Sequence, residues 1–324
     1  MQARVTNRAL LILCCILISL TSGCKQEPTA ASSTIQQHGA GGSVQKKGRT
    51  FAIVYSTADV FHKVVTSRAE AVASKLGAQL VIKAPDEANL EQQIRMMENL
   101  IKQRVDGIAV SPVNADALAP YINKAVDAGI QVICFDNDAP QSKRAAFIGV
   151  NNYEAGRMLA SYIDRALDGK GMIIAETGTI SYSSIQQRVA GFRDYLARLP
   201  EMQLLELRTD GDSLDKAIAN VEKMIDAHPH FEAYAALDSL AGSAAILVWK
   251  AKGLSQLSVT TSGSPELLDG VMNKQITALM SLQEDAWGYR IIQLLNDACD
   301  GKAVQEWNQL EPTFVTQQSL KSIK

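Results

Sequence analysis

The sequence has no clustered positive charge. Its 32 lysines and arginines and 34 aspartates and glutamates leave a formal net charge of -2, and no segment gathers the basic side chains that a phosphate backbone requires. The sequence also has no Walker loop, no GxGxxG motif and no GxSxG turn. These absences argue against nucleic-acid binding and against the nucleotide-dependent and serine-dependent enzymes that carry those motifs.

A long apolar run occurs at the N-terminus. Arg4 and Arg8 precede the segment ALLILCCILISL (residues 9–20), which is too short to span a bilayer comfortably. This pattern predicts a secretory signal peptide over residues 1–23. The following LTSGC resembles the lipobox of bacterial lipoproteins, with Leu20 one place further from the cysteine than is common. The resemblance implies lipidation of Cys24; the alternative is an ordinary signal peptide cleaved nearby.

Residues 24–49 are polar and rich in Ser, Gly, Gln and Lys, which predicts a flexible tether between a lipid and a folded body. Cysteine is otherwise scarce, since only Cys134 and Cys299 follow Cys24. Two cysteines make no disulfide framework. Cys134 lies in an apolar strand and is expected to be a buried free thiol, and its pairing with Cys299 stays open.

From residue 51 onward, short apolar runs alternate with segments of helical periodicity. The predicted strands are 51–55, 79–83, 107–111, 130–135, 172–176, 203–207, 234–237 and 257–261, with helices between them that include 184–198, 214–227 and 240–252. Repeated strand–helix units predict parallel sheets covered on both faces. Because the second half repeats the plan of the first, we expect two similar α/β lobes.

Ligands bind beyond the carboxyl ends of the strands in such sheets. The rule directs attention to the turns after Tyr55, Ser111, Phe135, Glu176, Leu237 and Thr261. The most conspicuous turn is Asp136-Asn137-Asp138, where a buried strand gives way to three polar side chains.

Six segments of the sequence can be compared with known families by their order and spacing: STADVF (56–61), IKQRVDGIAVSPVNADAL (101–118), AVDAGIQVICFDND (125–138), FIGVNNYEAG (147–156), QQRVAGF (186–192) and HPHFEAYAALDSLAGSAA (228–245). Together they resemble the type I periplasmic binding proteins, in the branch of the ribose- and galactose-binding proteins. The resemblance covers residues 50–316. It implies two hinged Rossmann-like lobes with a ligand cleft between them.

The same resemblance implies the domain bounds and the partners. The N-terminal lobe would comprise residues 50–150 and 283–308, and the C-terminal lobe 151–282 and 309–324. The helix at 285–300 would then pack on the N-terminal lobe. A monomer in the periplasm or at the cell surface would bind a small polar ligand, with a sugar expected, and deliver it to an ABC transporter permease. No cofactor is implied.

The ligand-binding residues follow by family position. Asp136 would accept hydrogen bonds from two sugar hydroxyls, Phe61 would stack on the sugar ring, and Arg188 would reach across the cleft. Asp138 is expected to close a turn. The remaining candidates flank these or occupy matching turns: Ser56, Asp59, His62, Asn137, Asp238, Ser262 and Gln283.

Three of these assignments have a structural alternative. Phe61 could be a core residue, Arg188 could pair with an acid on the helix surface, and His62 could be a solvated residue at a helix start.

The chain also departs from ribose binders, with Asn137 in place of an arginine, Leu237 in place of an asparagine and Ser262 in place of an aspartate. Leu282 stands where the hinge glutamine is expected, next to Gln283.

Other classes of function remain as alternatives. A calcium loop around Asp136 would need about six oxygen ligands and a glycine at the bend, whereas Ala139-Pro140 follows, so no metal is expected. Ser181, Ser183 and Ser184 have no evident histidine and acid to activate them, so catalysis is not expected. A sensory lipoprotein that presents its ligand to a chemoreceptor or histidine kinase would share the fold.

Overall fold

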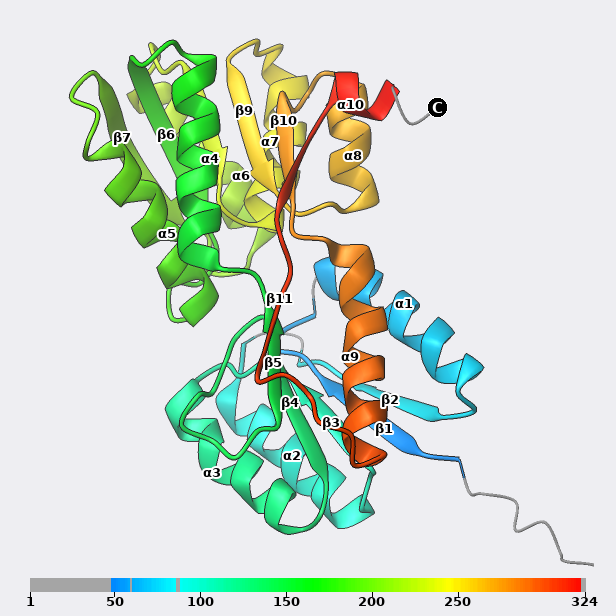
Figure 1. The fold of residues 1–324 in the computed structure, drawn as a ribbon. Coiled ribbons are helices and arrows are strands. Elements are labelled where there is room, and N and C mark those ends of the chain that lie inside the picture. Colours follow the sequence, from blue (N-terminus) through cyan, green and yellow to red (C-terminus); the bar gives the residue numbers. More distant parts are fainter. Residues whose placement is uncertain (1–47, 59, 86–87, 322–324) are drawn as a thin grey trace, which may run out of the picture. The chain divides into compact units, whose positions relative to one another are not determined.

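The computed structural model of the chain describes residues 48–58, 60–85 and 88–321, without the side chains of Val60 and Phe61. The predicted signal peptide, Cys24 and Asp59 lie outside the described residues. In the described part, the chain forms two α/β lobes, each built around one sheet (Figure 1).

The first sheet consists of parallel strands in the order β11-β5-β4-β3-β1-β2. Its central strands are almost wholly buried, because helices cover both faces. The bounds are β1 Thr50–Val54, β2 Gln79–Lys83, β3 Gly107–Val110, β4 Gln131–Phe135, β5 Ala146–Gly149 and β11 Trp307–Gln309.

The second sheet has the order β12-β10-β9-β8-β6-β7. Its strands are parallel except β12, which pairs antiparallel with β10. The bounds are β6 Gly171–Thr177, β7 Met202–Thr209, β8 Ala233–Ala236, β9 Leu257–Thr261, β10 Ala278–Ser281 and β12 Thr313–Thr316.

The helices follow the predicted crossover plan. Where the N-terminus of a helix is described, it is usually preceded by a residue whose side chain accepts a hydrogen bond from the first turn. Asn89 has this role before α2, and Asn114 has it before α3. The bounds are α1 Val60–Lys75, α2 Leu90–Gln103, α3 Ala115–Asp127, α4 Asn152–Ala166, α5 Ser183–Leu196, α6 Leu214–Ala227, α7 Ser239–Lys252, α8 Pro265–Met272, α9 Glu284–Cys299 and α10 Gln317–Lys321.

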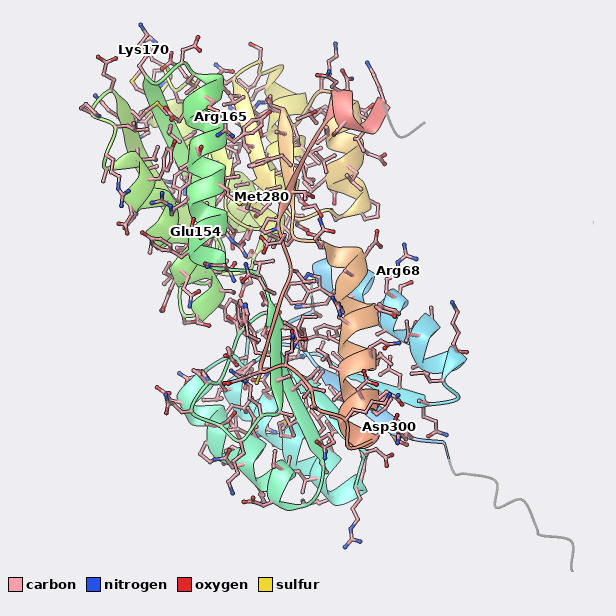
Figure 2. The ribbon with its side chains drawn as sticks, viewed as in Figure 1. Arg68, Glu154, Arg165, Lys170, Met280 and Asp300 are labelled. Atoms are coloured by element: carbon pink, nitrogen blue, oxygen red, sulfur yellow. The ribbon has the colours of Figure 1, made fainter. Side chains whose placement is uncertain are left out.

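The chain passes between the lobes at β5–α4, at β10–α9 and at β11–β12 (Figure 1). Helix α9 packs against α1 and the first sheet, which is the position expected of the 285–300 helix. The contact is close, because a Cβ on Gly288 would lie 2.2 Å from the Val65 carbonyl oxygen. Arg68 of α1 projects beside α9, with its Nε 2.8 Å from Asp285 Oδ1 (Figure 2).

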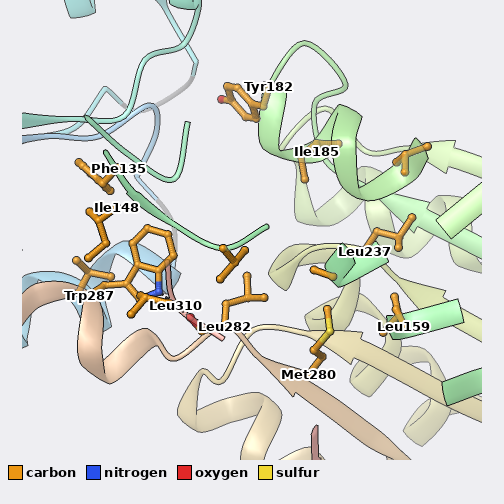
Figure 3. Close-up of a cluster of buried hydrophobic side chains, with 14 of the residues drawn as sticks. Phe135, Ile148, Leu159, Tyr182, Ile185, Leu237, Met280, Leu282, Trp287 and Leu310 are labelled. Atoms are coloured by element: carbon orange, nitrogen blue, oxygen red, sulfur yellow. Dashed lines mark hydrogen bonds between the residues drawn. The ribbon is translucent and has the colours of Figure 1, made fainter. Parts of the chain in front are cut away.

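Apolar side chains fill the region where these passages meet (Figure 3). Trp287 of α9 is buried, and its Nε1 donates a 2.7 Å hydrogen bond to the Leu282 carbonyl oxygen. Leu282 and Leu310 belong to the same cluster as Ile148 of β5 and Met280 of β10. The three passages of the chain between the lobes are therefore held in place by the packing of apolar side chains, in addition to their covalent connection.

Cys134 and Cys299 are both free thiols, the first buried and the second partly exposed. Burial raises the pKa of the Cys134 thiol to about 12. None of the described helices has the length and hydropathy needed to cross a bilayer.

Candidate functional site

A cavity of about 300 Å³ lies at the carboxyl ends of the strands of both sheets. Residues of the first lobe line one side: Ser56, Thr57, Ala58, His62, Lys63 and Asp136. Residues of the second lobe line the other: Gly178, Tyr182, Ser184, Ile185, Arg188, Asp212, Asp238, Ser239, Leu240, Ser243, Thr261 and Ser262. Leu282, in the β10–α9 connection, completes the lining.

Six of the predicted site residues therefore share one cavity: Ser56, His62, Asp136, Arg188, Asp238 and Ser262. Asp59 lies outside the described residues, and so does the side chain of Phe61, so both stay predictions. Asn137 and Gln283 are absent from this lining, although the structure describes both. The Gln283 Nε2 instead donates to Thr313 Oγ1 at 3.0 Å, beside the chain passage.

Asp136 leaves the end of β4 in the left-handed backbone region, with φ of 58°. Non-glycine residues are uncommon in this region, although Asp adopts it more readily than most, and such residues concentrate at functional sites. Its amide donates to the Ile148 carbonyl oxygen at 3.1 Å, which holds the turn against β5. This backbone conformation places the Asp136 side chain on the cavity wall.

The neighbours of Asp136 take other roles. Asn137 is 2% exposed and contacts Ser111, Asp136, Ser183 and Ser184. Asp138 accepts hydrogen bonds from its own turn at Ala139 N and from Arg144 through Nε and Nη2. The predicted turn role of Asp138 agrees with these contacts.

Arg188 of α5 is the main buried cation at the cavity. It is 4% exposed, and its Nε and Nη2 donate to Asn152 Oδ1 at 3.1 and 2.5 Å, while Nη1 donates to the Leu237 carbonyl oxygen at 2.6 Å. Burial lowers the pKa of the guanidinium, and the carboxylates of Asp136, Asp238 and Glu284 oppose this shift. Because a guanidinium has five N–H groups, two remain for other acceptors.

Two carboxylates converge at Gly178, just beyond the end of β6. A Cβ on this glycine would lie 2.4 Å from Asp238 Oδ2 and 2.9 Å from Asp212 Oδ1. Asp238 also caps α7 by accepting from Ala241 N, and Asp212 accepts from the hydroxyls of Thr179 and Tyr182. The absence of a side chain at Gly178 gives these carboxylates room at the cavity wall.

Two further acids lie behind this wall. Glu176 is fully buried, and burial raises its pKa to about 7 against the opposing hydrogen bonds from Asn220 and Tyr234. Asp210 is 1% exposed; burial, followed by the charge of Asp238, raises its pKa to about 8. The raised pKa values mean that burial favours the protonated, neutral forms of both acids behind the second-lobe wall.

The hydroxyl group of Ser262, on the cavity wall, is buried and lacks a hydrogen-bond partner among the described residues. Its side chain is 3% exposed, its φ is 90°, and its Oγ has no hydrogen-bond partner within the described part of the chain. A buried hydroxyl without a partner is costly, and each instance calls for an explanation. A polar ligand in the cavity would supply one.

On the first-lobe wall of the cavity, two of the predicted site residues are buried. His62, near the start of α1, is buried with its ring centroid 4.2 Å from that of Tyr55. The solvated position considered for His62 does not agree with this burial. Ser56 is also buried, and it lines the cavity together with Tyr182 of the other lobe.

Sequence reasoning missed several lining residues, notably Tyr182, Asp212 and Ser243. Asp212 lies beyond the end of β7, so the strand-end rule applied to residues 203–207 would have indicated it. Tyr182 precedes α5, and nothing in the sequence distinguishes it from a core tyrosine. No group of three or more metal-ligating side chains occurs among the residues that the structure describes.

A model of the periplasmic binding protein domain matches residues 51–303. The chain is 23% identical over 302 residues to the ribose import binding protein of Bacillus subtilis, covering 93% of this chain and 96% of that protein. It is 27% identical over 241 residues to the D-ribose/D-allose-binding protein of Pseudomonas aeruginosa, covering 71% of this chain and 75% of the relative.

Solved structures show the same architecture. An ABC transporter solute-binding protein from Burkholderia graminis, in complex with D-arabinose, superposes with a TM-score of 0.80 at 25% identity, over 85% of this chain and 97% of the other. The family match, the paired parallel sheets and the cavity at their strand ends agree with one another. The chain belongs to the periplasmic binding protein family.

Proposed function

We propose that the protein is an exported solute-binding protein that binds a monosaccharide in the cavity and delivers it to the permease of an ABC transporter. The observation that carries the proposal is the cavity between two lobes of this family fold, with the polar side chains of Asp136, Arg188 and Ser262 on its walls. The names of the relatives, which include ribose, allose and arabinose binders, support the choice of ligand.

The chemistry of the walls suits a neutral polyhydroxylated molecule. Carboxylates such as Asp136 accept hydrogen bonds from hydroxyl groups, and the two remaining N–H groups of Arg188 donate to ring or hydroxyl oxygens. The Ser262 hydroxyl, which has no partner within the described residues, would both donate and accept. The volume of about 300 Å³ lies at the small end of ligand sites, which favours a single sugar over an oligosaccharide.

The departures from ribose binders bear on which sugar is bound. Leu240, Ile185 and Leu282 make part of the lining apolar. The Leu237 side chain is fully buried in the core, and its carbonyl oxygen accepts a hydrogen bond from Arg188. We expect a ligand that presents an apolar face or fewer hydroxyls toward Leu282, and Phe61 and Asp59 remain predicted partners on the other side.

Attachment to a membrane through Cys24 is part of the proposal. It depends on the basic flank, the apolar run and the LTSGC segment, and on the polar tether that follows them. Mass spectrometry of the N-terminal peptide from membrane-fraction protein would show a diacylglyceryl cysteine if the proposal holds. An unmodified N-terminus at a nearby residue would show an ordinary cleaved signal instead.

Ligand identification tests the function directly. Ligand released by denaturing the purified protein would be identified by mass spectrometry, and a panel of pentoses, hexoses, deoxy sugars and polyols would be titrated by calorimetry. Saturable binding of at least one monosaccharide without its chemical conversion is the expected result. Failure of the whole panel to bind, or turnover of a bound sugar, would contradict the proposal.

A further inference from the structure

Helix α5 begins without a capping side chain of its own. The residue at its cap position is Tyr182, which makes no side-chain hydrogen bond to the first turn. Helices α2, α3, α4, α6, α7 and α8 all have an Asn, Ser or Asp at this position that accepts from the first turn. The first amides of α5 therefore need an acceptor from elsewhere.

That acceptor comes from the opposite lobe. Asn137 follows β4 in the first lobe, and its Oδ1 accepts a 3.0 Å hydrogen bond from the Ser184 amide in the first turn of α5. The same oxygen accepts from Ser183 Oγ at 3.2 Å. This arrangement reproduces the bond of an N-cap asparagine, although the asparagine is 47 positions away in the sequence.

The other end of the Asn137 amide faces the cavity wall. Its Nδ2 donates to Asp136 Oδ2 at 3.1 Å and to Ser111 Oγ at 3.3 Å. One rigid amide plane thus joins the helix terminus of the second lobe to the carboxylate expected to receive the ligand. If the lobes separate, the cap of α5 and the orientation of this amide are lost together.

We propose that Asn137 is a cap for α5 supplied by the opposite lobe, and that it positions the Asp136 carboxylate when the two lobes meet. The proposal deepens the function proposed above, since it concerns retention of ligand at the same site. Asn137 would act through Asp136 and through closure, without touching the ligand. This role of Asn137 explains why this polar residue is buried yet absent from the cavity lining.

Three variants separate the two halves of the proposal. Asn137→Ala removes both the cap and the donor to Asp136. Asn137→Asp keeps an acceptor for the Ser184 amide, because Asp and Asn cap helices about equally well, but it puts a like charge beside Asp136. Asn114→Ala is the matched control, since Asn114 caps α3 through Ala117 N and does not line the cavity.

Hydrogen exchange of the Ser184 amide in the purified protein tests the cap without any ligand. A cap bond corresponds to roughly a three- to thirtyfold change in an equilibrium, so Asn137→Ala is expected to speed exchange by about that factor. Asn137→Asp and Asn114→Ala should leave exchange at Ser184 within about twofold of the wild type, on the same scale. Unchanged exchange in Asn137→Ala would overturn the proposal.

Stopped-flow dissociation of D-ribose, D-allose or D-arabinose, whichever calorimetry shows to bind, tests the second half. Both Asn137 variants are expected to raise the dissociation rate by about tenfold or more, since each loses a hydrogen bond to a charged group, while Asn114→Ala dissociates like the wild type. Wild-type dissociation in both variants would overturn the positioning role. If the wild type binds none of the sugars, the proposed function fails, while the exchange result still decides whether Asn137 caps α5.

Discussion

The side-chain oxygen of Asn152 accepts two hydrogen bonds from the guanidinium of Arg188, at 3.1 Å from Nε and 2.5 Å from Nη2. Asn152 begins α4, directly after the chain passes from the first lobe to the second. The cation expected to reach the ligand is thus held by the first residue of α4, the helix that follows the passage between the lobes. Its orientation depends on the crossing as well as on α5.

Asn152→Ala should weaken ligand binding without removing any group from the cavity lining. The Arg188 guanidinium would lose two of its three hydrogen bonds and would no longer be held in one orientation. We expect at least a tenfold loss of affinity by calorimetry, and a loss of ~1–3 kcal/mol in the free energy of unfolding, because buried donors lose their partner. Unchanged affinity would show that Arg188 does not need this support.

Asp136→Asn should abolish most of the binding while the protein stays folded. The side chain keeps its shape but loses its charge, and hydrogen bonds to charged groups contribute ~1.5–3 kcal/mol each, so the expected loss is about ten- to a hundredfold or more. Calorimetry measures the affinity, and thermal unfolding monitors the fold. Asp116→Asn, an exposed change in the first turn of α3, is the control and should bind normally.

Gly178→Ala should also impair binding, for a steric reason. The added Cβ would lie 2.4 Å from Asp238 Oδ2 and 2.9 Å from Asp212 Oδ1, so both carboxylates would have to move. A loss of affinity of about tenfold is expected, which corresponds to ~1.4 kcal/mol. Wild-type affinity for the panel sugars would show that the positions of these two carboxylates do not matter for the ligand.

Stability should fall as the pH rises through neutrality. The folded-state pKa values of Glu176 and Asp210, about 7 and about 8, are raised above their unfolded values near 4, so the native state holds more protons between about pH 4 and pH 8. Their contribution to the free energy of unfolding is fully present below the unfolded values and is lost as the pH rises through the folded ones. Denaturant unfolding across this range measures the loss.

Asp210→Asn tests this pH dependence of stability at a single residue. The amide mimics the protonated acid and still accepts from the Asp212 amide through its oxygen, so the variant should be more stable than the wild type at pH 8.5, and the difference should be smaller at pH 5. Glu222→Gln, on the exposed face of α6, is the control and should follow the wild-type curve. A wild-type pH dependence in Asp210→Asn would contradict the burial of an ionisable group at this position.

Much of the fold follows from local pattern. The apolar runs at 51–55, 107–111 and 130–135 became β1, β3 and β4 within one residue, since buried parallel strands read as continuous apolar segments. The strands β5, β10, β11 and β12, which have three or four residues each, were not predicted from their periodicity. Such short runs become strands only when a neighbouring strand offers its hydrogen-bonding edge.

The sequence by itself determined the alternation of strands and helices, the strand-end positions of Asp136, Asp238 and Ser262, and the polar turn after β4. Local spacing and turn chemistry suffice for these. Only the tertiary structure decided that Asn137 reaches α5 of the other lobe and that Arg188 is held by Asn152. Such contacts join residues tens of positions apart, and their geometry depends on how two separately packed sheets present their edges to each other.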